Sequence, residues 1–556
     1  MATFVKAPCD EGVIRSAPDT SPCAPNVGVW VLVATILGSS MAFIDGSVVN
    51  VALPVIQREL NATATDLQWI VEAYSLFLAA LILVGGSLGD HFGRRRIFAI
   101  GITIFIVASI ACGLSPNVLQ LIIARAFQGI GGALLVPGSL AIISASFSNE
   151  QRGRAIGTWS GFSSITSLVG PVLGGVLVQY ASWRWVFFIN VPLAAVVLGV
   201  LFWRVPESRD EDASGRLDWW GTVLVTLGLG AIVYGLIQAG SLGLGSPQVL
   251  IALAIGIVAL IAFLLVEART PAPLVPLTLF RSPTFSGTNL LTFLLYGALS
   301  GLTYFLPFNL IQVQGYTPTF AGAAFVPFVL MMFLFSRWTG GLVNRFGAKL
   351  PLVVGPVITA IGFVLFALPG IGSGAGSYWI TFFPAIVVIG FGMTITVAPL
   401  TTAVMGAVEQ RHAGIASGIN NAVSRTAGLL AIAVFGIVVL SVFTSSLDSQ
   451  LATLHLAPGV QQLIDVQRIK LAGITIPTNV SGGVQVALKR AIDESFVSGF
   501  RLVALISAAL ALASALSAWL LVEGKKPARA ESTAKESHAS ASIVEANEQE
   551  PQISAD

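Results

Sequence analysis

Long apolar stretches recur along almost the whole chain, and short polar or glycine-rich segments separate them. A helix that crosses the hydrocarbon core of a bilayer needs about 20 consecutive, mostly apolar residues. The stretches that meet this requirement lie near residues 28–52, 67–89, 97–115, 118–145, 155–179, 184–204, 219–240, 248–267, 285–312, 319–343, 350–369, 378–404, 413–441 and 497–521. The pattern therefore predicts an all-α integral membrane protein with fourteen transmembrane helices.

Basic residues are distributed unevenly among the segments between these helices. They follow the even-numbered helices, at Arg94 to Arg96, Arg152 and Arg154, Arg204 to Arg216, Arg269 and Arg281, Arg345 and Lys349, and Arg411. Segments after odd-numbered helices are short and nearly uncharged, apart from Arg58, Arg184 and one longer segment. Because lysine and arginine in short loops mark the cytoplasmic side, an even number of helices places both termini in the cytoplasm. We expect a multi-pass protein of the cell membrane.

Three segments lie outside the predicted helices. Residues 1–26 are polar and proline-rich, and we expect a cytoplasmic tail without a cleavable signal peptide. Residues 523–556, rich in Ala, Ser and Glu, are expected to form a disordered cytoplasmic tail. Residues 442–496 mix Pro, Gly and scattered charges with an amphipathic piece near Val484 to Ile492. We predict that this segment is an external loop or cap.

A short pattern occurs twice in the chain, and the second copy lacks the acid and two of the arginines of the first. The corresponding positions are Gly86, Asp90 and Gly93 in the first copy and Gly340, Asn344 and Gly347 in the second. Two related halves suit a transporter in which one half rocks against the other. We therefore predict an N-terminal six-helix bundle at 27–204, two inserted transmembrane helices with linkers at 205–280, and a C-terminal six-helix bundle at 281–522.

The first copy forms a strongly basic turn between two predicted helices. Gly86 and Gly89 would let helices approach closely, and Gly93 can take the positive φ that a tight turn requires. Asp90, beside Arg94 and its two following arginines, can lock the turn to neighbouring helix ends through charge-assisted hydrogen bonds. We predict a conformational gating turn; the alternative is that the arginines only set the topology.

Ionisable side chains deep in a membrane are costly and are candidates for function. From the helical rise, Asp45 lies about 22 Å from the cytoplasmic face, Glu72 about 8 Å below the outer face and Arg125 about 10 Å below it. All three fall at about one level, where two acids and an arginine could form a proton site. Two other interpretations stay open: a static salt bridge, and a Glu72 that lies in the interfacial zone. Asn420, Asn421 and Arg425 form a second buried polar candidate in the C-terminal half.

Composition narrows the class of protein. The chain has 556 residues, of which 55% are hydrophobic and only 10% charged, and its net charge of +2 gives no reason to expect a nucleic-acid partner. Cys9, Cys23 and Cys112 suggest neither a disulfide framework nor a metal site. The chain contains no Walker-type phosphate-binding loop that would point to ATP. We expect no cofactor, no metal and no enzymatic activity.

A glycine-rich stretch lies in the fifth predicted helix. Its key positions are Gly161, Gly170, Pro171, Gly174 and Gly175. Small residues let helix backbones touch, and a proline inside a helix removes a hydrogen bond and kinks it. The spacing resembles the G-x₈-G-P-x-x-G-G antiporter signature of drug exporters. The basic turn likewise resembles the G-x-L-x-D-x-x-G-R signature loop of the major facilitator superfamily, with His91 where the family more often has Lys or Arg.

Other motifs agree with this resemblance. They are Asp45-Gly-Ser-Val-Val-Asn-Val-Ala-Leu-Pro54, Trp69-Ile-Val-Glu-Ala-Tyr74, Arg125-Ala-Phe-Gln-Gly-Ile-Gly-Gly-Ala133, Trp183-Arg-Trp-Val-Phe-Phe-Ile-Asn-Val-Pro192 and Leu217-Asp-Trp-Trp-Gly221. Together, over about residues 27–522, the chain resembles the fourteen-span drug:proton antiporter family. The resemblance implies the major facilitator fold, proton coupling by Asp45 and Arg125, and recognition of cationic drugs by Glu72. It further implies that the glycine motif shapes exchange rather than leak.

These observations favour a proton-coupled secondary exporter of amphipathic or cationic small molecules, of the multidrug-efflux type. Its 33 phenylalanines and few buried charges suit an apolar, tolerant pocket. We expect its partners to be protons, small hydrophobic or cationic substrates and the lipid bilayer, and we expect it to work as a monomer. The alternatives are a dedicated exporter of one metabolite or lipid and a non-transporting membrane sensor or scaffold, against which Asp45 argues.

Overall fold

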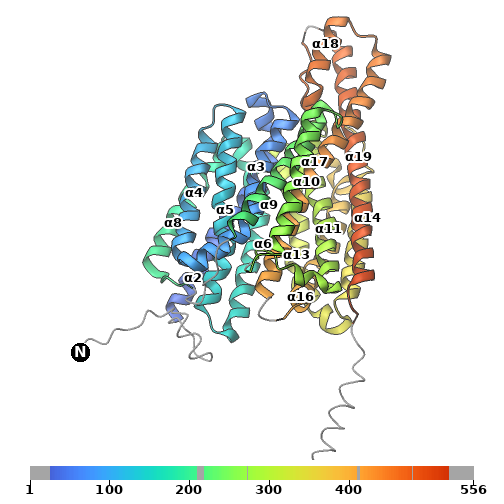
Figure 1. The fold of residues 1–556 in the computed structure, drawn as a ribbon. Coiled ribbons are helices and arrows are strands. Elements are labelled where there is room, and N and C mark those ends of the chain that lie inside the picture. The colour runs from blue at the N-terminus through green and yellow to red at the C-terminus, as the bar shows by residue number, and fades with distance from the viewer. Residues whose placement is uncertain are drawn as a thin grey trace, which may run out of the picture.

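The computed structural model describes residues 25–209, 218–271, 273–372, 374–409, 413–478 and 480–524, and the predicted terminal tails lie almost entirely outside them. Within these ranges the chain is nearly all helical and contains no strand (Figure 1). Thirteen helices of the described chain are long and apolar enough to cross a membrane. Every predicted stretch coincides with a helix. In α6 (Asn149–Tyr180) several residues lie outside the description, and the apolar run of its described residues is Val169–Tyr180. The all-helical membrane architecture is confirmed, and the count of fourteen stays a prediction.

The first group of helices is here called the N-terminal bundle. Its members are α2 (Pro25–Leu60), α3 (Ala64–Phe92), α4 (Arg94–Leu114), α5 (Val118–Ser146), α6 (Asn149–Tyr180), α7 (Trp185–Phe188) and α8 (Asn190–Arg204). Glycine permits its closest contacts: a Cβ on Gly129 of α5 would lie 2.3 Å from the carbonyl oxygen of Tyr74 in α3. A Cβ on Gly85 of α3 would lie 2.1 Å from the carbonyl oxygen of Ala133. The backbones of α3 and α5 therefore touch, which fixes the side chains of these two helices relative to each other.

The last group is here called the C-terminal bundle. It contains η1 (Leu277–Arg281), α11 (Pro283–Phe308), η2 (Asn309–Val313), α12 (Pro318–Ala323), α13 (Val326–Phe346), α14 (Lys349–Phe366), η3 (Ala375–Ser377), α15 (Tyr378–Thr381), α16 (Phe383–Gly406), α17 (Ala413–Leu454), α18 (Pro458–Gln467), η5 (Arg468–Gly473) and α19 (Gly482–Leu521). In Figure 1 the helices coloured blue to cyan lie largely on one side and those coloured yellow to red on the other. The beginning of α2 and the end of α19 lie at the same end of the molecule, opposite α18 (Figure 1).

Two helices separate the bundles in sequence: α9 (Trp219–Leu242) and α10 (Pro247–Glu267). They pack tightly against each other, because a Cβ on Gly256 of α10 would lie 2.5 Å from Cγ1 of Ile232 in α9. Of the two, α9 contacts α3 of the N-terminal bundle and α17 of the C-terminal bundle. The inserted pair therefore covers one side of the seam where α3 meets α17.

The segment 442–496, predicted as an external loop or cap, is mostly helical. Helix α17 continues to Leu454 and α19 already begins at Gly482, and both project beyond the bundles together with α18 (Figure 1). No proline or glycine interrupts residues 442–454, so nothing in the sequence stops α17 at the membrane boundary. Arg468 of η5 links α17 and α18 within this projection through ion pairs of 2.5 Å with Asp448 and 2.7 Å with Asp465. Its bonds to these two carboxylates raise the pKa of its guanidinium.

The two bundles are tied together near the α18 end. The Gln57 amide of α2 donates to the carbonyl oxygen of Lys470 in η5 at 3.0 Å and accepts a bond of 2.8 Å from Gln312. The Gln68 amide of α3 donates to the carbonyl oxygen of Ile432 in α17 at 3.0 Å. Leu471 of η5 is buried beside them with φ 54°, a backbone conformation that a leucine adopts only where surrounding contacts hold it.

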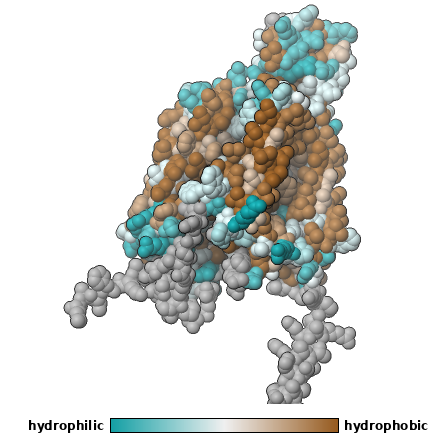
Figure 2. Space-filling view, in the orientation of Figure 1, coloured by the Kyte–Doolittle hydropathy of each residue, from teal (hydrophilic) through white to brown (hydrophobic). Residues whose placement is uncertain are grey.

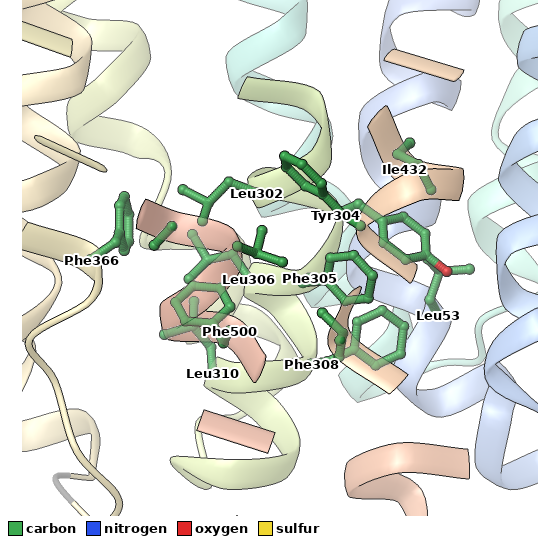
Figure 3. Packing of buried hydrophobic residues seen from close by; sticks show 14 of the residues in the cluster. Leu53, Leu302, Tyr304, Phe305, Leu306, Phe308, Leu310, Phe366, Ile432 and Phe500 are labelled. Carbon is green, nitrogen blue, oxygen red and sulfur yellow. The ribbon is translucent and has the colours of Figure 1, made fainter. Parts of the chain in front are cut away.

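Apolar side chains occupy both the interior and the lateral surface. The largest buried cluster draws on both bundles: Leu53 of α2, Phe305 and Phe308 of α11 and Ile432 of α17 lie together in Figure 3. A broad apolar band covers the middle of the face shown in Figure 2. Polar residues gather at the two ends of the molecule and on the projection. Such a band matches the hydrocarbon layer of a membrane, so the chain is a multi-pass membrane protein.

Candidate functional site

Asp45 lies near the middle of α2 and is fully buried. Its Oδ2 atom accepts a hydrogen bond of 2.5 Å from Nη1 of Arg125, which α5 contributes and which is 1% exposed. Its Oδ1 atom accepts hydrogen bonds from the amides of Gln128 at 2.8 Å and Asn190 at 3.4 Å. Every oxygen of this carboxylate therefore has a donor from the N-terminal bundle, and the predicted proximity of Asp45 and Arg125 is confirmed.

Further polar side chains complete a network around this pair, here called the Asp45 site: Asp45, Ser109, Arg125, Gln128 and Asn190. Asn190 donates to Ser109 at 3.0 Å, and Gln128 accepts from Arg125 at 2.8 Å. Ser109, Gln128 and Asn190 were not predicted as site residues, although Gln128 and Asn190 lie within two of the quoted motifs. Gln128 lies one helical turn after Arg125, so a search for polar residues three or four positions from each buried charge would have found it. Ser109 had no comparable signal, because its bonds to Gln128 and Asn190 form only when α4, α5 and α8 pack together.

Arg125 is held in place on several sides. Its Nε atom donates to the carbonyl oxygen of Ile70 at 3.0 Å, and its guanidinium carbon lies 4.2 Å from the centroid of the Tyr74 ring. A guanidinium over an aromatic face gains electrostatic attraction from the ring. The arginine is therefore fixed between the Asp45 carboxylate and a tyrosine of α3.

Glu72 is also fully buried, but it does not belong to the Asp45 site. Neither of its carboxylate oxygens has a hydrogen-bond partner among the described residues. It lies one turn from Gln68, which bonds to α17, and one turn from Leu76, which packs with α9 and α17. Tyr74, two positions on, faces Arg125 instead. The expectation of one site with both acids is therefore wrong, because Glu72 and Tyr74 are two residues apart on α3 and point about 200° apart around the helix.

A cavity of about 190 Å³ lies beside the Asp45 site, between the two bundles. Its walls include Phe43 and Asn50 of α2, Tyr74 of α3, Arg125 of α5 and Arg425 of α17. A single water needs about 10–15 Å³ on this measure, so the cavity has room for a small molecule or several waters. It is here called the central cavity.

The predicted polar group in α17 does not form one site. Arg425 is half-buried and lines the central cavity, whereas Asn420 donates to Thr292 of α11 at 2.8 Å and to Asn289 at 3.1 Å. Asn421 is exposed, so the prediction that it is buried is wrong. Successive helical residues point about 100° apart, which turns neighbouring side chains toward different surroundings.

The basic turn has the predicted backbone and an additional partner. Gly93 has φ 106°, and the guanidinium of Arg94 pairs with Asp90 through two contacts of 2.8 Å. The link to a neighbouring segment comes from Glu207, which follows α8 and accepts the backbone N–H of Arg95 at 2.9 Å. The turn is thus attached to the segment after α8, a contact that was not predicted from the sequence.

Gly86 and Gly89, which precede this turn, do not make the close helix contact that was predicted for them. A Cβ on Gly86 would lie 3.6 Å from Pro137, and one on Gly89 would lie 3.9 Å from Arg94, both ordinary contacts. Gly85, one residue earlier, makes the backbone approach to α5 instead, so this part of the prediction is wrong. In the second copy, Gly347 has φ 77° between α13 and α14, which preserves the turn geometry without the acid.

The glycine motif of α6 lies against helices of both bundles. A Cβ on Gly170 would lie 2.0 Å from Oγ of Ser47 in α2, and one on Gly174 would lie 3.1 Å from the carbonyl oxygen of Val48. A Cβ on Gly175 would instead lie 2.4 Å from the carbonyl oxygen of Pro318 in α12. Pro171 lies inside the same helix, and the side of α6 at Gly161 is not described. The motif therefore places α6 in direct contact with α2 and with the C-terminal bundle.

The described residues contain no group of three or more His, Cys, Asp or Glu side chains that could hold a metal ion. Cys112 is buried and free, whereas Cys9 and Cys23 lie outside the described ranges. The ionisable side chains in these surroundings are Asp45 and Arg125 of the Asp45 site, Glu72 on another face of α3, and Arg425 at the wall of the central cavity.

Known proteins resemble the chain in sequence and in fold. The sequence model of the Major Facilitator Superfamily matches residues 35–432. The Multidrug resistance protein Stp of Mycobacterium tuberculosis (strain CDC 1551 / Oshkosh) is 34% identical over 507 residues, which cover 88% of this chain and 91% of that protein. The Tetracenomycin C resistance and export protein of Streptomyces glaucescens is 34% identical over 496 residues, covering 87% and 90%. The fold is shared with the solved structure of a bacterial homologue of the human lysosomal transporter Spinster, in an inward-facing and unoccupied conformation. The TM-score is 0.59 at 18% identity, and the match covers 91% of this chain and 100% of that one.

Proposed function

The chain belongs to the major facilitator superfamily, and we propose that it exports amphipathic small molecules, cationic ones among them, in exchange for protons. Relatives named for multidrug resistance and for tetracenomycin C export support efflux as the activity. The observation that carries the proton coupling is the buried Asp45–Arg125 pair beside a cavity shared by both bundles. Transport rather than catalysis is the activity that these features support.

Protonation of Asp45 would change the balance of charge in the N-terminal bundle. The ionised carboxylate attracts Arg125, and a proton on Asp45 removes that attraction. Arg125 would keep its bonds to Gln128 and to the carbonyl oxygen of Ile70, and its guanidinium already lies over Tyr74 at the cavity wall. Protonation of Asp45 therefore leaves the positive charge of Arg125 uncompensated at the wall of the central cavity.

Glu72 is proposed to recognise cationic substrates. A buried carboxylate without a partner is costly, and a cationic ligand would supply the missing partner. Its position on the face of α3 that meets α17 places such a ligand between the bundles, where its presence can affect their relative movement.

The remaining site residues are proposed to control movement rather than to bind ligand. The turn of Gly86, Asp90, Gly93 and Arg94, attached to Glu207, would hold the ends of α3, α4 and α8 in one of two arrangements. The glycine motif of α6 would let α2 and α12 slide across it at close range. Both are expected to act in a monomer of the plasma membrane, with both termini in the cytoplasm and the α18 projection outside.

The decisive experiment measures dye efflux from cells that express the protein, with and without a protonophore. We expect export of several unrelated amphipathic dyes, and we expect the protonophore to abolish their accumulation outside. Export of a single compound class would favour a dedicated exporter of one metabolite or lipid. If no compound is exported although the protein reaches the membrane, the proposal fails and a sensor or scaffold role is favoured.

A further inference from the structure

The central cavity contains one positive charge that nothing in the described chain balances. Arg425 of α17 forms no hydrogen bond or ion pair there, although its side chain is half-buried and lines the cavity. It is also the one cavity residue from the C-terminal bundle among those that form the described wall; the others come from α2, α3 and α5. A partly desolvated cation without a partner is unfavourable unless a ligand or water compensates it.

The second arginine of the cavity is compensated. Arg125 is paired with Asp45, so together they contribute no net charge while Asp45 is ionised. The other titratable groups that face Asp45 are Tyr74 of α3 and Cys112 of α4, both neutral at physiological pH. Glu72 lies on the opposite side of α3, and the α6 sequence between Ala155 and Tyr180 contains no charged residue.

We propose that Arg425 determines which substrates can be exchanged for protons, by giving the cavity a permanent positive charge. This inference rests on the proposed function. With Asp45 ionised, the cavity carries one positive charge. With Asp45 protonated, Arg125 is no longer neutralised and the cavity carries two, one on each bundle.

This change of charge has opposite effects on different ligands. A cationic ligand is repelled more strongly by two charges than by one, and a neutral apolar ligand is displaced by the water that two charges attract. Both leave when the proton arrives, as exchange requires. A ligand with a carboxylate is instead held more tightly in the protonated state, through charge-assisted hydrogen bonds to guanidinium.

The substrate class follows from this difference. Neutral and cationic amphiphiles can be exported, and Glu72 on the seam offers cations a compensating charge. Amphiphiles with a free carboxylate bind the proton-loaded protein and stall it, so they act as inhibitors. Phe43 and the ring of Tyr74 offer the apolar body of either class the same surface.

The test compares a rhodamine dye that has a free carboxylate with the ethyl ester of the same dye. Dissociation constants are measured by fluorescence polarisation on the purified full-length protein. The ratio of the two constants should shift toward the acid by about tenfold in Asp45→Asn, which mimics the protonated state. Arg425→Gln should weaken binding of the acid by about tenfold without weakening that of the cationic ester, and Arg425→Lys should preserve the preference.

Transport in proteoliposomes with an imposed pH gradient provides the second readout. The wild-type protein should accumulate the ester, and the acid should inhibit that accumulation more strongly as the pH falls. An acid-to-ester ratio that is the same in Arg425→Gln and in the wild type overturns the role of Arg425. If the wild type fails to accumulate the ester, the proposed exporter function fails instead, and the binding ratios still decide the charge of the cavity.

Discussion

Among the described residues, two carboxyl groups in membrane-spanning helices are fully buried, and their surroundings differ in kind. Asp45 has donors on both oxygens, all from helices of its own bundle. Glu72 has no donor in the described chain, and its side of α3 faces α9 and α17. One acid is therefore compensated within a single bundle, and the other lies uncompensated on the seam between two bundles.

The difference shows how a buried charge can serve two purposes. An ion pair within one bundle keeps its geometry while the bundles move. Its protonation state can therefore persist through that movement. An unpaired carboxylate at a seam depends on what arrives there, because only a ligand or a proton relieves its desolvation. A single chain can thereby separate energy coupling from substrate recognition.

The largest effect is expected at the compensated acid. Asp45→Asn keeps the shape of the side chain but cannot be ionised, so gradient-driven accumulation of dye should fall to background. Substrate should still bind, although cationic substrates bind more weakly beside the uncompensated Arg125, and downhill exchange should persist because Glu72 and the cavity remain. Proteoliposome transport with and without a pH gradient measures both, and Asp448→Asn in the projection is the control. Uphill accumulation by Asp45→Asn that a protonophore still collapses would place the proton site elsewhere.

The uncompensated acid should show a selective effect. Glu72→Gln removes the negative charge of the seam, so export of cationic dyes should fall by about tenfold or more while neutral dyes stay within about twofold. The melting temperature of the purified variant should be unchanged or higher, because an unpaired buried charge is removed. Equal losses for cationic and neutral dyes would mean that Glu72 supports the transport cycle itself.

Two adjacent glycines of α6 differ in the same way, because Gly174 contacts its own bundle and Gly175 contacts the other one. Gly175→Ala would place a Cβ 2.4 Å from the carbonyl oxygen of Pro318 in the other bundle, so exchange should slow several-fold. Gly174→Ala meets Val48 of the same bundle at 3.1 Å, which should lower thermal stability with a smaller effect on exchange. Initial exchange rates and melting temperatures of the two variants decide the matter. Similar rates in both variants would show that the seam is not what limits movement.

The smallest effect is expected at the basic turn. Its ion pairs are partly exposed and contribute at most about 1 kcal/mol each, so Asp90→Asn and Glu207→Gln should each slow transport by about two- to fivefold. Membrane insertion should be unchanged, and Glu494→Gln, which removes an ion pair with Arg490 in α19, is the matched control. Full-speed transport by both variants would leave the turn with a topological role only.

Depth along a helix could be predicted from the sequence, but direction around it could not. The rise per residue placed Asp45 and Arg125 at one level, and the structure confirms their contact. The same reasoning grouped Glu72 with them, although α3 turns it toward a different neighbour. It also grouped Asn421 with Arg425, although one is exposed and the other lines the cavity.

The basic turn shows the same limit. The positive φ of Gly93 and the pairing of Asp90 with Arg94 follow from local sequence, because turn geometry and a four-residue spacing are local properties. Glu207 lies more than a hundred residues later along the chain, and no local pattern connects it with Arg95.

The sequence by itself determined the membrane architecture, the family and the positions of the buried charges. Each depends on runs of apolar residues or on spacings within one helix, which the chain encodes directly. The tertiary structure decided the surroundings of each charge: donors from two other helices for Asp45, none in the described chain for Glu72, and a shared cavity for Arg125 and Arg425. Those surroundings depend on which faces of separate helices meet, and that is fixed only when all of them pack together.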